Sequence, residues 1–347
     1  MNKIVSIQFL RAFACYSVLF VHVLQMLNIK PFGDYFISGG YGVDLFFILS
    51  GFLIYITTKN EDNWKSFAIK RVFRIFPMYW FCLTLYFLVF TIHFKKNYSL
   101  VYCIQNFLML PWSGPVNTHS LIIGVAWSTV YEVYFYTVFL MLIVFKIPKK
   151  YIITVFILLL FIFKATSGIN LFNLNENQIF QFLYSVAGYT HILPFVLGVS
   201  LAMLCDNPNR FSFIADFKFK KVVFICLHLI YIIILLKKYN QINSYLISLL
   251  IFFMWLNIDL IWYVNYNSVV SKFFVKMGDI SFSIYFLHIL VIEILISYFK
   301  ITDLLILIFL ASVVSIAASI ITFKYIESPF INLSRKIVQS LTNSNNK

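Results

Sequence analysis

Long apolar runs recur along this chain and narrow its possible folds to one class. Runs of mainly apolar residues alternate with short polar connections, and an α-helix needs about 20 such residues to cross a bilayer. The chain is 61% hydrophobic and 12% charged, which is more apolar surface than a soluble domain of this size can hide. Because the runs are continuous rather than short and alternating, we expect an all-α transmembrane bundle, not a β-barrel.

The apolar runs predict about ten transmembrane helices. Their expected ranges are 5–27, 36–57, 75–93, 127–145, 151–168, 180–204, 222–236, 245–264, 280–298 and 304–323. Most of the 27 lysine and arginine residues fall in connections on the same side of the membrane as the N-terminus. The positive-inside rule therefore predicts that both termini are cytoplasmic. We expect one membrane domain over 1–330 and a short polar tail over 331–347.

The charge and the cysteines exclude several function classes. The net charge of +14 is explained by lysine and arginine residues in the predicted cytoplasmic loops. The apolar runs leave no soluble basic domain that could bind nucleic acid. The five cysteines are scattered, with neither a disulfide framework nor a zinc spacing. No GxSxG, Walker A, GxGxxG or HExxH motif occurs, and no metal site is predicted.

The first apolar run contains two ionisable residues, Arg11 and His22. Eleven residues are close to a whole number of helical turns, so both side chains lie on one face of the helix, about 16 Å apart along its axis. Because an ionisable group inside a membrane is costly, the pair predicts a functional site.

A carboxylate in the second run is the expected partner of His22. Asp44 lies about seven residues from the outer end of its helix and His22 about five from the end of its own. The short connection makes these helices antiparallel neighbours, so we expect the two side chains at similar depth. A carboxylate beside an imidazole suits a general base. A structural polar pair that holds two helices together is the alternative.

Two further groups of polar residues flank the apolar runs. Arg71 and Arg74 are three residues apart and share a helical face, which suits bidentate binding of phosphate; ordinary positive-inside charge is the alternative. Glu132 lies about five residues into the fourth predicted helix from its outer end, after Trp127 and Ser128. A buried carboxylate needs a partner, and either Arg11 or a hydroxyl of the acceptor would serve. The aromatic residues around it are interpreted as packing.

Six motifs in a fixed order resemble the acyltransferase-3 family of integral membrane acyltransferases over roughly residues 4–330. They are LRAFACYSVLFVH, GVDLFFILSGFLI, KRVFRIFPMYW, WSTVYEVYFY, ISFSIYFLHILV and YIESPF. The resemblance implies O-acylation, usually O-acetylation, of cell-surface glycans such as O-antigen, capsule or exopolysaccharide. One departure is Ala12, where the family commonly has glycine.

The resemblance also implies roles for single residues. His22 becomes the catalytic base, and the implied catalytic group is Arg11, His22, Asp44 and Glu132. The implied acyl-donor-binding residues are Arg71 and Arg74, and the implied substrate-binding residues are Trp127, Ser128 and His288. Acetyl-CoA or another acyl-CoA is expected as a substrate, with no bound cofactor. The expected partners are this donor, a glycan or lipid-linked glycan acceptor and the lipids of the inner (cytoplasmic) membrane, without nucleic acid.

Rival functions are left open by the sequence. Within the enzyme class, the alternative is acylation of a small molecule or lipid-linked precursor at the cytoplasmic side. A glycan-lipid transporter would also need buried charge, but no internal repeat is visible. A polysaccharide polymerase would carry a larger outer loop than residues 94–126, and a membrane sensor would not need His22 and Asp44 at one depth.

Overall fold

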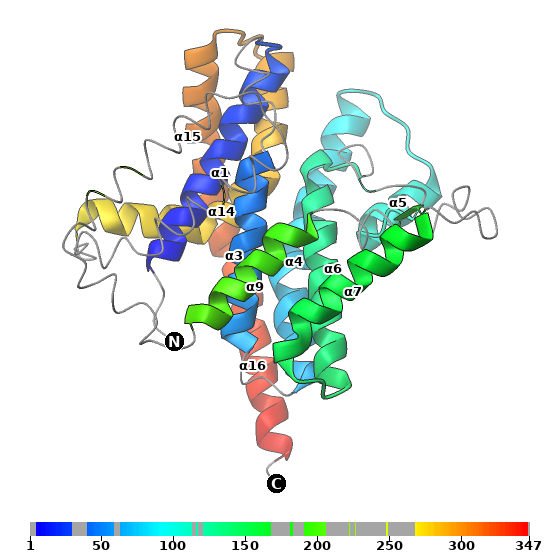
Figure 1. Cartoon of the computed structure of the whole chain (residues 1–347). Coiled ribbons are helices and arrows are strands. Elements are labelled where there is room, and N and C mark those ends of the chain that lie inside the picture. The colour runs from blue at the N-terminus through cyan, green and yellow to red at the C-terminus, as the bar shows by residue number, and fades with distance from the viewer. Residues whose placement is uncertain are drawn as a thin grey trace. The chain divides into compact units, whose positions relative to one another are not determined.

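The computed structural model describes an all-helical chain at residues 5–29, 40–58, 63–112, 116, 121–167, 181–182, 191–205, 222, 226, 248 and 268–345 (Figure 1). The chain divides into two compact units. Unit 1 comprises Met1–Ile56 and Leu193–Ile320, and unit 2 comprises Thr57–Ile192 and Ile321–Lys347.

Six helical runs in the described ranges are long and apolar enough to cross a membrane. They are Ser6–Met26, Tyr41–Thr58, Trp64–Ile92, Gly124–Val144, Ser271–Ser297 and Leu304–Asn343. The predicted all-α membrane fold is therefore confirmed. The predicted helices at 222–236 and 245–264 lie outside the described residues, and the count of ten and the cytoplasmic termini stay predictions.

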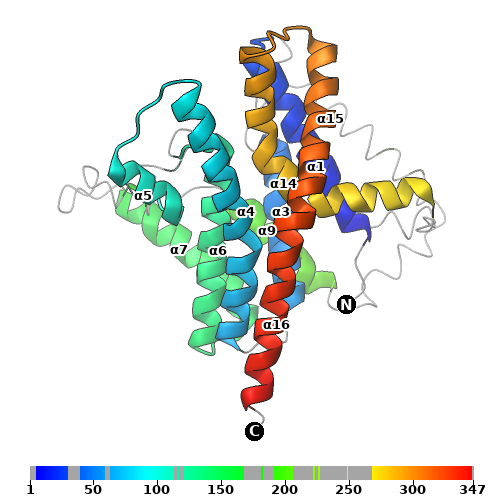
Figure 2. The same ribbon diagram turned by 180° about the vertical axis from the view of Figure 1, so that it is seen from behind.

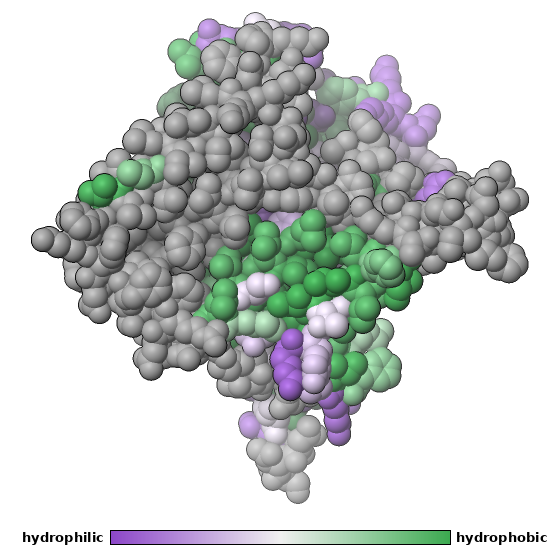
Figure 3. All heavy atoms as spheres, in the orientation of Figure 1, coloured by the Kyte–Doolittle hydropathy of each residue, from purple (hydrophilic) through white to green (hydrophobic). Residues whose placement is uncertain are grey.

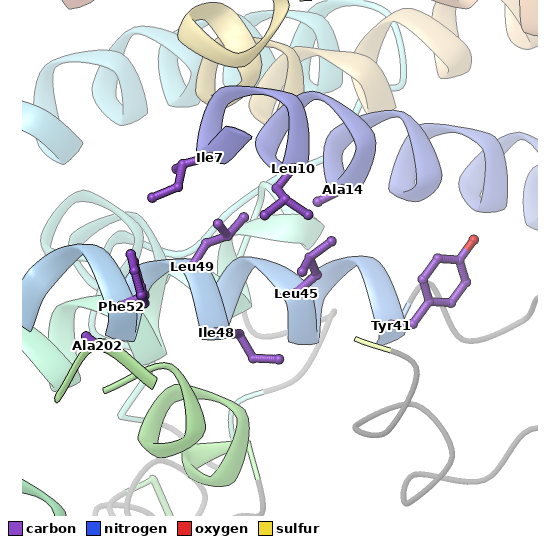
Figure 4. Close-up of a cluster of buried hydrophobic side chains, with 9 residues drawn as sticks. All are labelled: Ile7, Leu10, Ala14, Tyr41, Leu45, Ile48, Leu49, Phe52 and Ala202. Carbon is purple, nitrogen blue, oxygen red and sulfur yellow. The ribbon is translucent and has the colours of Figure 1, made fainter. Parts of the chain in front are cut away.

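Unit 1 is built around helix α1 (Val5–Met26), which packs along α14 (Val269–Ser297) and beside α3 (Gly40–Thr58). Apolar side chains of α1 and α3 point toward each other in a cluster that also includes a residue of α9 (Ile192–Cys205), as Figure 4 shows. The cluster residues are Ile7, Leu10, Ala14, Tyr41, Leu45, Ile48, Leu49, Phe52 and Ala202.

Helices α3 and α9 cross so closely that glycine is required on both. A Cβ atom built at Gly51 would lie 2.1 Å from the carbonyl oxygen of Phe195. In the reciprocal position, a Cβ atom at Gly198 would lie 2.0 Å from the carbonyl oxygen of Ile48. Both distances are well below van der Waals contact, so the two backbones touch directly, as in small-residue crossings of membrane helices.

Helix α14 begins at Val269, well before the predicted start at residue 280. Ser268 caps it by accepting a hydrogen bond from the backbone N–H of Ser271 at 3.1 Å. Figure 1 shows the helix turning sharply, with its first part running across its second. Gly278 lies in this helix and meets the backbone of α1, where an added Cβ would be 2.3 Å from the carbonyl oxygen of Gln8. A short connection then leads to α15 (Leu304–Thr322).

Helix α4 (Trp64–Ile92) is the longest element described in unit 2 and also starts earlier than expected. Asn63 caps it by accepting from the backbone N–H groups of Lys65 and Ser66. The basic stretch that was predicted as a loop is thus the first part of a 29-residue helix. Pro77 lies inside the helix, where it removes one backbone hydrogen bond without ending it.

The short apolar stretch in the segment 94–126 forms helix α5 (Leu100–Leu108), which docks on the middle of α4. The hydroxyl of Tyr79 donates to the carbonyl oxygen of Asn106 at 2.6 Å. The indole of Trp80 donates to the carbonyl oxygen of Phe107 at 2.9 Å, and these two rings stack 5.1 Å apart. Tyr79 and Trp80 lie about 18 Å from the C-terminal end of α4, so the chain folds back alongside the helix.

Replacing Asn106 with leucine is expected to lower the unfolding free energy by about 1–3 kcal/mol. The fully buried Asn106 side chain accepts from the backbone N–H of Ile122 at 2.7 Å and donates to the carbonyl oxygen of Tyr102. Leucine would leave that N–H buried without an acceptor. Thermal unfolding in detergent measures the change, and Thr137→Ala, which removes an exposed hydroxyl bonded within its own helix, is the control. Equal stability of both variants would contradict the assignment.

Helix α6 (Trp127–Val144) follows a 3-10 turn at Gly124–Ala126 and packs beside α4. A second turn, Lys149–Tyr151, leads to α7 (Ile152–Ser167). The outward side chains of α7 are large and apolar, and Ile157, Leu158, Phe161 and Ile162 are all at least half exposed. Figure 3 shows hydrophobic residues gathered on the face where α7 lies, as expected for a surface that meets lipid.

The predicted polar tail is helix α16 (Ser328–Asn345), joined to α15 by a π-helical turn at Phe323–Glu327. Helix α16 lies beside α4, as Figure 2 shows, and the rings of Phe73 and Phe330 are 6.2 Å apart. The sequence after residue 330 is therefore ordered against unit 2.

Candidate functional site

Two histidines from distant parts of the chain meet in unit 1. The rings of His22 on α1 and His288 on α14 have centroids 5.3 Å apart. The His288 side chain is buried, with 1% of it exposed, and His22 is half-buried. The packing of α1 along α14 brings them together. No local sequence pattern indicates this pairing, because 265 residues lie between the two histidines.

Hydrogen bonding determines which nitrogen of His288 carries hydrogen. Its Nδ1 lies 3.1 Å from the carbonyl oxygen of Ile284, and because a carbonyl oxygen only accepts, Nδ1 must donate. Neutral His288 therefore has a lone pair on Nε2, and no described residue makes a hydrogen bond to this buried atom. In the same way, Nδ1 of His22 lies 3.0 Å from Oε1 of Gln25, which leaves Nε2 of His22 as a base.

Arg11 and Asp44 lie in the same unit, at a different level from the histidine pair. Helix α1 is continuous over Val5–Met26, so the predicted separation of Arg11 and His22 along one face holds. Gly42 of α3 packs against Ala14 and Val18 of α1. This register places buried Asp44 about 5 Å from the level of Arg11 and about 12 Å from that of His22. His22 and Asp44 therefore do not lie at a common depth, contrary to the prediction.

In unit 2, Arg71 packs against two aromatic rings. Its guanidinium carbon lies 5.4 Å from the ring centroid of Phe67 and 5.0 Å from that of Tyr136. Its Nη2 donates to the hydroxyl of Thr57 at 3.0 Å. The ring faces carry negative charge density and attract the cation, so one ring from α4 and one from α6 hold the guanidinium.

Glu132 has a hydroxyl partner, although not the one expected. The phenol of Tyr136, one turn further along α6, donates a hydrogen bond to Oε1 of Glu132. The predicted need for a partner is met here by an aromatic residue that the sequence analysis interpreted as packing. Tyr136 contacts both this carboxylate and the guanidinium of Arg71, which was predicted to bind the donor.

Arg74 points to the C-terminal helix run. Its Nη1 lies 3.2 Å from Oε1 of Glu327, whose side chain is completely buried. Glu327 belongs to the π-helical turn, and such turns often occur at functional sites. The two arginines of the predicted pair therefore contact different groups, and Glu327 is the second carboxylate found near them, after Glu132.

The remaining predicted residues lie at the start of α6. The ring of Trp127 is 5.1 Å from that of His191, which is 5.4 Å from Tyr131. The hydroxyl of buried Ser128 donates to the carbonyl oxygen of Val125 at 3.1 Å. Sequence reasoning interpreted His191 as a packed residue, and only its place beside Trp127 marks it. Within the described ranges, no group of three or more histidine, cysteine or carboxylate side chains is arranged to hold a metal ion.

Comparison with known proteins decides the class of this site. Residues 4–324 match the Acyl_transf_3 family, described as an acyltransferase domain. The chain belongs to the acyltransferase-3 family. This member of the acyltransferase-3 family is thus a multi-pass membrane enzyme that transfers acyl groups other than amino-acyl groups. The resemblance inferred from the six motifs is confirmed.

One curated protein is similar to this family member over most of its length. It is named "Putative acetyltransferase ORF330", from Acidianus two-tailed virus, and is 28% identical over 294 residues, or 82% of each chain. No solved structure matches the chain.

Proposed function

We propose that this acyltransferase moves an acetyl group from cytoplasmic acetyl-CoA to a hydroxyl of a cell-surface glycan. The observation that carries the proposal is the pair His22 and His288, whose rings lie 5.3 Å apart in an apolar bundle. Each neutral ring has a lone pair on Nε2, so one can accept the proton of the reacting hydroxyl while the other accepts a hydrogen bond from a neighbouring hydroxyl of the acceptor. An acetyl donor is favoured by the name of the related viral protein.

In the proposed reaction, Nε2 of His22 takes the proton of the acceptor hydroxyl, and a neighbouring hydroxyl of the acceptor sugar donates a hydrogen bond to Nε2 of His288. The alkoxide attacks the carbonyl carbon of the thioester, and a tetrahedral oxyanion forms. Arg11 lies on the same face of α1 but about 16 Å from His22 along the helix, so we assign it to the path of the donor through the bundle and not to the oxyanion. The C–S bond then breaks, and the thiolate of CoA takes the proton from His22.

Residues of unit 2 complete the proposal. Arg71 and Arg74 bind the phosphates of CoA, because paired guanidinium groups match phosphate geometry. Trp127, Ser128 and Glu132 bind the acyl and acceptor groups. Both units are assigned to one reaction because the family match runs through both of them, over residues 4–324.

The test compares surface glycan from cells with and without the protein. We expect the mass of the glycan repeat unit to gain one acetyl group when the protein is present, and isotope supplied in acetyl-CoA to appear in that increment. An increment on a lipid-linked precursor inside the cell, with none at the surface, would move the reaction to the cytoplasmic side. Movement of glycan-lipid across vesicles without consumption of acetyl-CoA would replace the proposal by transport.

A further inference from the structure

The two arginines of unit 2 differ in their surroundings. Arg74 donates to the buried carboxylate of Glu327 at 3.2 Å. Arg71 donates to the hydroxyl of Thr57, and no carboxylate among the described residues lies within ion-pair distance of it. Its buried Nε also has no hydrogen-bond partner among the described residues. Arg71 therefore keeps both its charge and a directed N–H for a ligand.

Tyr136 contacts both Arg71 and the nearby carboxylate. One face of its ring meets the guanidinium at 5.0 Å, while its hydroxyl donates to Oε1 of Glu132. The ring of Phe67 packs edge-on against that of Tyr136, with centroids 6.5 Å apart, and also contacts the guanidinium of Arg71. With 9% of its side chain exposed, Tyr136 has little freedom to leave this position.

The hydroxyl of Tyr136 has a specific consequence for Arg71. A carboxylate close to a guanidinium tends to form a direct ion pair, which would cancel the charge that a phosphate needs. The tyrosine hydroxyl binds that carboxylate, and the ring separates it from the cation. Glu132 is thereby kept in the site without blocking Arg71.

We propose that Arg71, rather than Arg74, takes the phosphates of the acyl donor, and that Tyr136 is a positioning residue that keeps Glu132 from neutralising it. This inference rests on the proposed role of the arginines in donor binding. Arg74, bound to Glu327 in the π-helical turn, connects α4 to the C-terminal helix run.

The experiment measures the dissociation constant of CoA by titration calorimetry on the full-length protein in detergent. We expect Tyr136→Phe, which keeps the ring and loses the hydroxyl, to weaken binding about tenfold, since hydrogen bonds to charged groups are worth about 1.5–3 kcal/mol. Tyr136→Leu, which also removes the ring face, should weaken it further. The double variant Tyr136→Phe with Glu132→Gln should restore binding, because the freed side chain then has no charge to offer Arg71.

Tyr134→Phe is the matched control, because Tyr134 is on the same helix and packs against Phe135 and Phe156, not Arg71. Its CoA affinity should equal that of the unmodified protein. If the unmodified protein does not bind CoA, the proposed donor fails. If it binds CoA and Tyr136→Phe binds equally well, or if Glu132→Gln gives no rescue, the positioning role is wrong while donor binding stands. A larger loss in Arg74→Lys than in Arg71→Lys would reverse the assignment of the two arginines.

Discussion

Replacing His22 with alanine is expected to slow acyl transfer by about 10² to 10⁴-fold, the usual contribution of a positioned general base. In the unmodified protein, Nδ1 of His22 is bound to Gln25, which leaves Nε2 to take the proton. His22 is only half-buried, so the variant should lose little packing and should insert and fold normally. The rate is measured as release of CoA from acetyl-CoA by purified protein with acceptor glycan, and folding as the unfolding temperature.

A second histidine provides the control for this experiment. His93 follows the last residue of α4 in unit 2, where its ring packs on that of Phe94. His93→Ala should leave the rate unchanged. The same assay on His288→Ala should show a loss smaller than that of His22→Ala, because His288 orients the acceptor through a neighbouring hydroxyl and does not take the reacting proton. Full activity of His22→Ala would remove His22 from the reaction.

Replacing Gly51 with alanine is expected to destabilise unit 1 by about 3 kcal/mol or more, at the upper end of overpacking effects. The new methyl carbon would lie 2.1 Å from the carbonyl oxygen of Phe195 and 3.1 Å from the backbone nitrogen of Val199. Neither atom can rotate away, so α3 and α9 must separate. The unfolding temperature in detergent and the yield of monodisperse protein measure the effect.

Gly42→Ala is the matched substitution on the same helix. Its nearest neighbour would be Cγ2 of Val18 at 2.8 Å, an atom at the end of a side chain that can move by rotation about one bond. The loss should be smaller than at Gly51. Equal loss at both positions would mean that the direct backbone contact between α3 and α9 does not govern the stability of unit 1.

The periodic apolar runs predicted much of the fold, because burial in lipid requires long uninterrupted helices. Helices α1, α3, α6 and α15 lie close to the predicted ranges. The start of α4 was missed because the charged residues before residue 75 interrupt the apolar run. Asn63, which caps the helix at its true start, was the available signal. Helix α5 was recognised only as an apolar stretch, since its docking depends on Tyr79 and Trp80.

The sequence predicted which residues belong to the sites, but it did not predict which of them contact each other. Arg11 and His22 share one helix, so helix geometry alone fixes their separation. The pairs His22 with His288 and Arg74 with Glu327 join positions far apart in the sequence, and helix periodicity carries no information about which helices become neighbours. Tyr136 was interpreted as packing because a tyrosine in an apolar run looks the same whether or not its hydroxyl binds a carboxylate.

The π-helical turn at Phe323–Glu327 makes the length of the chain there as important as its composition. The backbone N–H of Ser328 bonds to the carbonyl oxygen of Phe323, five residues back, so this turn contains one residue more than an α-helical turn. Removing or adding one residue would rotate everything beyond it by about 100°. Phe330 would leave Phe73, and the C-terminal helix would present another face to α4. The direction in which the C-terminal helix faces therefore depends on the number of residues in this turn. The joint should tolerate substitutions better than insertions.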